Sequence, residues 1–190
     1  MSNAKILAFA GSTRTASFNK TLLRTAVRGA EAANASVTVI DLANYRMPIY
    51  DGDLEAESGL PENAEKLQAL FMDHNGLLIA SPEYNSSVAP VLKNTIDWMT
   101  RRDASANLRC FTGKTAGLIA TGGGLGGLRG LVHLRQILGS IGVLVIPGQA
   151  TVRGAWTAFD ENGELKEEEQ RNAVEGVGTS LAETLAKLHA

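Results

Sequence analysis

The feature that most constrains this chain is a short apolar segment near its beginning that breaks into a polar turn. Residues 6–10 are all apolar, which is the composition and length of a strand buried on both faces of a parallel sheet. After Gly11 the sequence becomes rich in Ser, Thr, Arg and Asn, and a helical spacing of apolar residues begins at Phe18. A helix that starts after such a turn points its free N–H groups and its positive dipole end into the turn. The segment therefore predicts a site for an anion.

The side chains of this turn suit a phosphate group. Ser12, Ser17 and Asn19 offer short polar donors, and Arg14 offers a planar cation that matches phosphate oxygens. Taken alone, Ser17 would be interpreted as a helix N-cap and Arg14 as a solvated charge. Four such groups in one strand-to-helix turn favour phosphate binding instead.

Two other glycine motifs indicate which class of phosphate-bearing ligand the chain could bind. The only Gly-Lys-Thr, at residues 113–115, has Leu108 where a nucleotide triphosphate loop needs its first glycine. The pattern Gly-x-Gly-x-x-Gly at residues 122–127 matches a dinucleotide fingerprint, but it comes late in the chain, and no Asp or Glu closes the strand expected at residues 142–146. A turn with Ser, Arg and Asn but without Gly-Lys suits a single terminal phosphate, such as that of FMN.

Composition limits the classes of protein that remain. With 190 residues and 44% hydrophobic content, the chain is expected to form one domain over residues 1–190. The net charge of −2 gives no basic surface for nucleic acid. No apolar run approaches the ~20 residues of a membrane span and the N-terminus lacks a signal peptide, so we expect a cytoplasmic protein. A single cysteine, Cys110, and three scattered histidines predict neither a disulfide nor a metal site.

Short apolar segments alternate with amphipathic helical patterns along the chain. This alternation predicts an α/β fold with three layers around a doubly wound five-stranded parallel sheet. Of the common strand orders of such sheets, we expect 2-1-3-4-5. The long connection over residues 43–60 is expected to be a functional or mobile loop at the edge of a site. The expected strands are residues 6–10, 36–42, 76–80, 114–121 and 142–146, and the expected helices begin near residues 18, 61, 91, 128 and 166.

Polar or glycine-rich turns follow the third and fourth strands as well as the first. Residues 81–87 combine Pro82 with several small polar groups, and residues 122–127 contain five glycines. The carboxyl ends of parallel strands share one edge of the sheet, and ligands bind there between strands one and three. We therefore expect these turns to face the phosphate turn, with the glycines leaving room for a ligand that lies on backbone.

Several of these motifs together resemble the NAD(P)H-dependent FMN reductases, a family with the flavodoxin-like fold that includes quinone, chromate and azo-dye reductases. The resemblance extends from the first strand to the fourth helix. It is carried by Gly11-Ser12-x-Arg14-x-x-Ser17-x-Asn19, Ser81-Pro82-Glu83-Tyr84-Asn85, Leu92-Lys93-Asn94-x-x-Asp97-Trp98 and His133-Leu134-Arg135-Gln136.

By this resemblance, the chain would be an oxidoreductase that uses bound FMN to pass electrons from NAD(P)H to flavin, quinone or a similar small-molecule acceptor. The protein would place the flavin without supplying a catalytic acid or base, and it would form a homodimer or homotetramer. Ser12, Arg14, Ser17 and Asn19 would hold the FMN phosphate; Pro82, Glu83, Tyr84, Asn85 and Ser86 would line the isoalloxazine ring; Gly122, Gly123 and Gly124 would border the ring from the other side.

Two alternatives stay open at this point, because the same turns would bind flavin in either case. The first is an electron carrier of the flavodoxin type. Such carriers are markedly acidic and have no arginine inside the phosphate turn, whereas this chain has Arg14 and a net charge of −2. The second is a nonenzymatic FMN-binding module. The physiological acceptor and the choice between NADPH and NADH are also open.

Overall fold

The computed structural model describes residues 4–189, and its centre is a parallel sheet of five strands. Each adjacent pair of strands is parallel, in the order β2-β1-β3-β8-β9. This order is the one expected from the sequence, so the doubly wound, flavodoxin-like architecture is confirmed. The strands are β1 (Lys5–Ala10), β2 (Ser36–Ile40), β3 (Gly76–Ala80), β8 (Thr115–Thr121) and β9 (Leu144–Val152).

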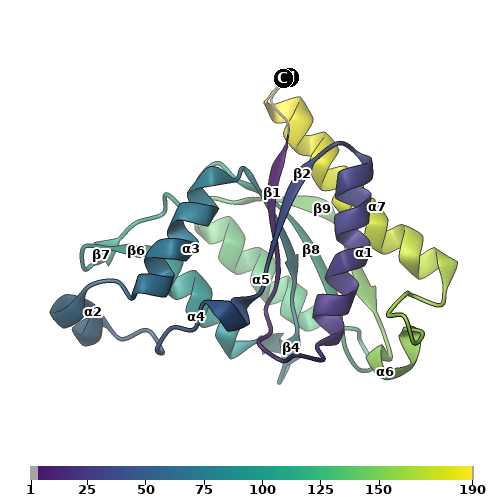
Figure 1. The fold of residues 1–190 in the computed structure, drawn as a ribbon, viewed down its shortest axis with the longest axis horizontal. Coiled ribbons are helices and arrows are strands. Elements are labelled where there is room, and N and C mark those ends of the chain that lie inside the picture. The colour runs from purple at the N-terminus through teal and green to yellow at the C-terminus, as the bar shows by residue number, and fades with distance from the viewer. Residues whose placement is uncertain (1–3, 190) are drawn as a thin grey trace.

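Helices cover both faces of the sheet (Figure 1). One face carries α1 (Phe18–Ala32) and α7 (Glu168–Leu188), and the other carries α3 (Glu62–Asp73), α4 (Pro90–Met99) and α5 (Leu128–Ser140). Because successive side chains of a strand point to opposite faces, Ile6 of β1 packs in the core beneath α1 and α7, whereas Leu7 packs in the core beneath the other three helices. Every residue of β3 and β8 is buried, as strands covered on both faces require.

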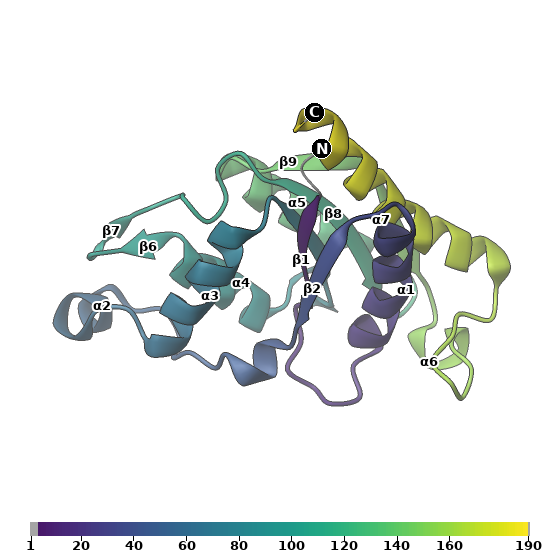
Figure 2. The same cartoon turned by 45° about the horizontal axis from the view of Figure 1, so that its top comes forward.

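The helices α1 and α7 lie side by side (Figure 2) and meet at glycines. A Cβ atom at Gly29 would overlap with the carbonyl oxygen of Glu175, and a Cβ atom at Gly178 would overlap with that of Ala26. The two backbones can approach this closely because glycine has no side chain at either position. This contact holds α1, and with it the turn that precedes α1, in place against the sheet.

Two strands end elsewhere than the sequence predicts. The prediction that the last strand ends at residue 146 is wrong: β9 continues to Val152, because a shift of register between Ala116 and Leu118 lets the ladder resume at Gln149. The second strand was expected to reach residue 42 but ends at Ile40. There the Asp41 carboxylate accepts a hydrogen bond from the backbone N–H of Ala43 at 2.9 Å and turns the chain into a 3₁₀ helix, η1 (Leu42–Asn44).

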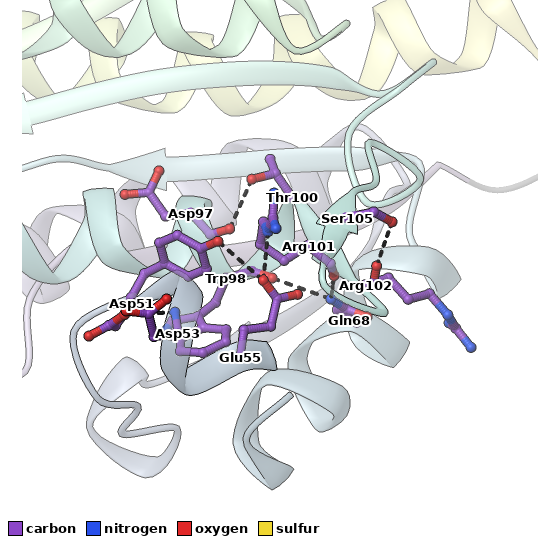
Figure 3. Close-up of polar contacts among 11 residues, drawn as sticks. Asp51, Asp53, Glu55, Gln68, Asp97, Trp98, Thr100, Arg101, Arg102 and Ser105 are labelled. Carbon is purple, nitrogen blue, oxygen red and sulfur yellow. Dashed lines mark hydrogen bonds and ion pairs between the residues drawn. The ribbon is translucent and has the colours of Figure 1, made fainter. Parts of the chain in front are cut away.

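The long connection between β2 and α3 is organised around a buried carboxylate (Figure 3). It contains a short helix, α2 (Gly52–Ser58), whose Glu55 is only 2% exposed. Glu55 Oε2 accepts hydrogen bonds from Nε of Arg101 at 2.8 Å and from the hydroxyl of Tyr50 at 3.1 Å. The Tyr50 ring packs edge-on against Trp98. Arg101 opens a small hairpin of β6 (Arg101–Arg102) and β7 (Ser105–Ala106), so the carboxylate ties α2 to this hairpin.

Candidate functional site

Three turns meet at the carboxyl edge of the sheet, at the bottom of Figure 1, and surround a cavity of about 220 Å³. They follow β1, β3 and β8, and the short helix α6 (Ala155–Ala158) after β9 completes the wall. The structure thus brings together the three turns that the sequence places at this edge, whereas no residue of the 43–60 connection lines the cavity. The lining residues are Ser12, Arg14, Ser17, Phe18, Asn19, Pro82, Glu83, Tyr84, Thr121, Gly122, Gly123, Ala155 and Trp156.

The turn after β1 presents donors that the protein itself leaves unused. Ser17 occupies the N-cap position of α1, yet its side chain makes no capping hydrogen bond, so the first N–H groups of the helix lack the usual partner. The Ser12 hydroxyl is largely buried and accepts a hydrogen bond from the backbone N–H of Arg14 at 3.3 Å. Arg14 is exposed, and its guanidinium has no ion-pair partner among residues 4–189. Hydroxyls, helix N–H groups and a cation therefore lie around one cavity, and together they are the donor set of an anion cradle.

Asn19 has a different environment from the one the sequence suggests. Its Nδ2 donates to the carbonyl oxygen of Thr121 at 2.9 Å, and its Oδ1 accepts from the N–H of Thr121 at 3.0 Å. The Thr121 hydroxyl in turn donates to the carbonyl oxygen of Val152 at 2.9 Å. The Asn19 side chain therefore joins the start of α1 to the ends of β8 and β9, and both of its polar atoms already have protein partners.

The turn after β3 forms a tight hairpin that leans on α5. Its strands are β4 (Glu83–Tyr84) and β5 (Ser87–Val88), and the two connecting residues, Asn85 and Ser86, have φ values of 51° and 65°. Two successive residues with positive φ indicate a type I′ turn. Glu83 Oε2 accepts from the N–H of Gly130 at 2.9 Å in the first turn of α5. Pro82, Glu83 and Tyr84 line the cavity, whereas Asn85 and Ser86 lie outside its lining.

The glycine-rich turn after β8 forms the opposite wall and is tied to α6. Gly123 O accepts from the N–H of Gly154 at 3.3 Å, and Gly122 O accepts from the N–H of Ala155 at 3.0 Å. Gly122 and Gly123 line the cavity. Gly124 does not line it, and a Cβ atom there would have no neighbour within 4 Å. This wall is therefore mostly backbone, with open space beside it.

Four lining residues were not among the candidates drawn from the sequence: Phe18, Thr121, Ala155 and Trp156. Phe18 is predicted only as the start of a helix, and Thr121 as the end of the strand that leads into the glycine-rich turn. Ala155 and Trp156 have no predicted role, and the strand expected before them ends at residue 146, nine residues before Ala155. With β9 ending at Val152, Trp156 comes four residues after a strand end at the same edge of the sheet. A correct strand boundary would have identified it.

The cavity offers hydroxyl, N–H and cationic groups that can bind an anion. Its carboxylate, Glu83, already accepts a hydrogen bond from α5, and its cation is Arg14. Over residues 4–189 the structure has no group of three or more His, Cys, Asp or Glu side chains that could hold a metal ion. Hydroxyl and N–H donors at one end and low backbone walls at the other fit a ligand with a phosphate on one side and a flat ring on the other. FMN has this shape and this charge.

The fold and the cavity together define a class of protein. A doubly wound parallel sheet with an anion cradle at its switch point, facing walls of backbone, is typical of proteins that bind a mononucleotide. No helix within the described part of the chain has both the length and the apolar character needed to cross a bilayer.

Comparison with known proteins gives the family. Residues 4–157 match the family model described as NADPH-dependent FMN reductase. The chain is 33% identical over 173 residues to an NAD(P)H-dependent FMN reductase of Pseudomonas aeruginosa, covering 90% of this chain and 89% of that one. It is 37% identical over 134 residues to a probable NADPH:quinone oxidoreductase of rice, covering 70% of this chain and 66% of the relative. The solved flavoenzyme NAD(P)H:acceptor oxidoreductase FerB of Paracoccus denitrificans superposes with a TM-score of 0.81 at 25% identity, covering 97% of this chain and 98% of FerB.

The chain therefore belongs to the NADPH-dependent FMN reductase family. It is an oxidoreductase of the flavoprotein class, with FMN as its cofactor and NAD(P)H as its source of electrons. The resemblance seen in the sequence and the enzyme class expected from it are confirmed. The role of each candidate site residue stays a prediction.

Proposed function

We propose that the cavity binds FMN with its phosphate on the turn between β1 and α1. The observation that carries this proposal is the unused N-cap of α1: Ser17 leaves the helix N–H groups without a side-chain partner, beside the Ser12 hydroxyl and the unpaired Arg14. An anion placed there accepts several charge-assisted hydrogen bonds at once. Asn19 lies in the first turn of the same helix. Its side chain contributes to the phosphate site by holding that turn against the backbone of Thr121.

The ring of FMN then lies between the hairpin after β3 and the glycine-rich turn after β8. Pro82, Glu83 and Tyr84 line one side, and Asn85 and Ser86 shape the turn that aims them. Gly122, Gly123 and Gly124 border the other side, where the absence of side chains leaves the ring accessible. Bound FMN supplies the redox chemistry, taking hydride from NAD(P)H and passing electrons to a second substrate. The residues of the chain bind the ring, orient it and leave one face open.

We infer that the acceptor is a small molecule of the quinone class. The rice relative is named a probable NADPH:quinone oxidoreductase, and an Escherichia coli relative that is 36% identical over 147 residues is named a quinone reductase. The exposed Tyr84 and the open space at Gly124 leave room for a planar molecule beside the ring. Free flavin is the alternative acceptor, in keeping with the name of the Pseudomonas relative.

We further infer that the protein acts in the cytoplasm as one domain per chain, in a homodimer or homotetramer, without nucleic acid. In support, α5 exposes Leu128 and Val132, which are 39% and 55% accessible in the single chain. An apolar helix face of this kind is suited to an interface between subunits. Light scattering coupled to size-exclusion chromatography measures the number of subunits directly, and a monomer at working concentration would contradict this inference.

The visible spectrum of the purified protein, followed by anaerobic mixing with NADPH and separately with NADH, tests the proposed function. A flavin spectrum that bleaches on mixing, and is restored by a benzoquinone, is the expected result. A bound flavin that stays oxidised with both nucleotides would favour an electron carrier or a binding module. No flavin binding, even after FMN is added, would refute the proposal.

A variant of Arg14 tests the placement of the phosphate. Arg14→Ala should weaken FMN binding roughly ten-fold while leaving riboflavin binding unchanged, because riboflavin has no phosphate and an exposed charge-assisted hydrogen bond is worth about 1.5 kcal/mol. Arg24→Ala is the control, since Arg24 is an exposed arginine on α1, the helix that follows the turn, and does not line the cavity. Equal losses for FMN and riboflavin in Arg14→Ala would place the phosphate elsewhere.

A further inference from the structure

Trp156 stands out among the residues around the cavity because its side chain is largely in solvent. It is 70% exposed, whereas the other tryptophan of the chain, Trp98, is fully buried. Within residues 4–189 the indole N–H of Trp156 has no hydrogen-bond partner, whereas that of Trp98 donates to the carbonyl oxygen of Pro48 at 2.8 Å. An exposed apolar residue on an open surface needs no explanation. Trp156 differs because it forms part of the wall of a ligand cavity.

The backbone that carries Trp156 is fixed relative to the cavity. Gly154 and Ala155 donate to the carbonyl oxygens of Gly123 and Gly122, and the Thr157 hydroxyl donates to Gly154 O at 3.1 Å. The tip of the indole also approaches the glycine-rich turn, since a Cβ atom at Gly123 would lie 3.9 Å from Cη2 of Trp156. The indole thus extends from a rigid one-turn helix beside the cavity, and its wide apolar surface lacks a protein partner.

We propose that Trp156 is a contact residue for FMN and closes the side of the cavity between the phosphate turn and the glycine-rich turn. This rests on the proposal that FMN binds in this cavity. Trp156 lines the cavity together with Ser17, Phe18 and Gly123, so a ligand that fills the cavity lies beside the indole. Covering the indole removes apolar surface from water, and its free N–H gives an oxygen atom of the ligand a donor. Trp156 therefore slows the loss of FMN and strengthens its binding.

Hydroxyl-radical footprinting, read by mass spectrometry in the dark with and without FMN, tests this contact without relying on activity. The oxidation rate of Trp156 should fall at least three-fold when FMN is bound. The affinity for FMN, measured by quenching of flavin fluorescence, should fall roughly ten-fold in Trp156→Ala and much less in Trp156→Phe, because phenylalanine keeps an aromatic face. Leu188→Ala is the control: Leu188 is 57% exposed near the end of α7 and does not line the cavity.

The outcomes separate this inference from the proposed function. Unchanged oxidation of Trp156 in protein that demonstrably binds FMN would overturn the contact and leave the FMN site standing. Unchanged FMN affinity in Trp156→Ala, with the fold verified by circular dichroism, would also overturn it. Failure of the unmodified protein to bind FMN would overturn the FMN site and the contact together. Protection of Trp156 with the expected order of affinities would establish the contact.

Discussion

Replacing Asn19 by alanine tests which of two roles Asn19 has: binding the phosphate, or holding the walls of the site together. The Asn19 side chain is 6% exposed, and both of its hydrogen bonds go to the backbone of Thr121, at 2.9 Å and 3.0 Å. Asn19→Ala removes both partners at once, and it leaves an N–H and a carbonyl group buried at the end of β8. The end of β8 is where the glycine-rich turn begins, so the cavity wall loses an anchor.

The size of the effect follows from the burial of the two groups. A backbone N–H or carbonyl left buried without a partner costs about 1–3 kcal/mol, so two of them lower the free energy of unfolding by about 2–4 kcal/mol once water reaches part of the space. For a chain of this size, urea unfolding should show a midpoint roughly 1 M lower. The affinities for FMN and for riboflavin should fall by the same factor, because the wall that loosens serves the whole ligand.

Urea unfolding followed by far-ultraviolet circular dichroism, together with binding of FMN and of riboflavin, measures these effects. Asn172→Ala is the matched control, because Asn172 is exposed on α7 and its change should lie within about 0.5 kcal/mol. A loss of stability below about 1 kcal/mol in Asn19→Ala would contradict the value assigned to the two hydrogen bonds. A loss of affinity for FMN alone would show that Asn19 binds the phosphate directly, as the sequence suggests.

Three further predictions concern the scaffold. Gly178→Ala should lower the free energy of unfolding by about 3 kcal/mol or more, because its Cβ overlaps with Ala26 O. Gly176→Ala, on the same helix but with open space around it, should raise the free energy of unfolding by up to about 1 kcal/mol. Thermal unfolding of both variants measures the contrast. Arg101→Ala should lower the urea midpoint more than Arg102→Ala, because only the first leaves the buried Glu55 carboxylate without its cation, and equal midpoints would refute this. Burial raises the pKa of the Cys110 thiol to about 11, so native protein at pH 8 should react far more slowly with an aromatic disulfide reagent than urea-unfolded protein. Because the unfolded thiol ionises first, near pH ~8.5, the contribution of Cys110 to stability should fall as the pH rises from there toward 11.

The sheet could be predicted from the sequence because its central strands are continuous apolar runs. The segments 6–10, 76–80 and 114–121 begin and end within one residue of β1, β3 and β8. Each run is bounded by glycine or polar residues, and burial on both faces removes the ambiguity of an alternating pattern. The alternation of strands with helices then indicated a doubly wound sheet, and the order 2-1-3-4-5 is that of the flavodoxin-like fold.

The last strand was harder to predict because it does not read as one apolar run. Pro147 and Gly148 interrupt it, and both residues usually end strands. In the structure the interruption coincides with the shift of register between Ala116 and Leu118, after which pairing resumes. A register shift depends on the neighbouring strand and has no local signal. Because the strand was expected to end at residue 146, Trp156 was not recognised as a residue close to a strand end; β9 in fact ends at Val152.

The sequence also does not show which polar groups that lie far apart in the chain will pair. Glu55 reads from the sequence as one of several charges in a long loop, yet it is buried because Arg101, 46 residues later, reaches it. The sequence predicts Asn19 as a ligand for phosphate, although an amide side chain can also bond to backbone. Its partner Thr121 is 102 residues away, so the difference depends on how closely two turns approach in the folded chain. Residue type identifies a donor, but only the fold identifies its acceptor.

The walls of the cavity are joined to one another by hydrogen bonds rather than by the ligand. The turn after β1 is held to β3 and to β8, the glycine-rich turn is held to α6, and the hairpin is held to α5. A site that is already assembled loses little conformational entropy when a ligand binds, so more of the contact energy appears as affinity. It follows that a substitution at a joint weakens every ligand alike, whereas a substitution at a contact weakens only ligands that carry the contacted group. Comparing FMN with riboflavin therefore separates contacts to the phosphate, which matter for FMN alone, from joints and ring contacts, which matter for both ligands. The joints are Gly11 N–H to Ala80 O, Asn19 to Thr121, Ala155 N–H to Gly122 O and Gly130 N–H to Glu83.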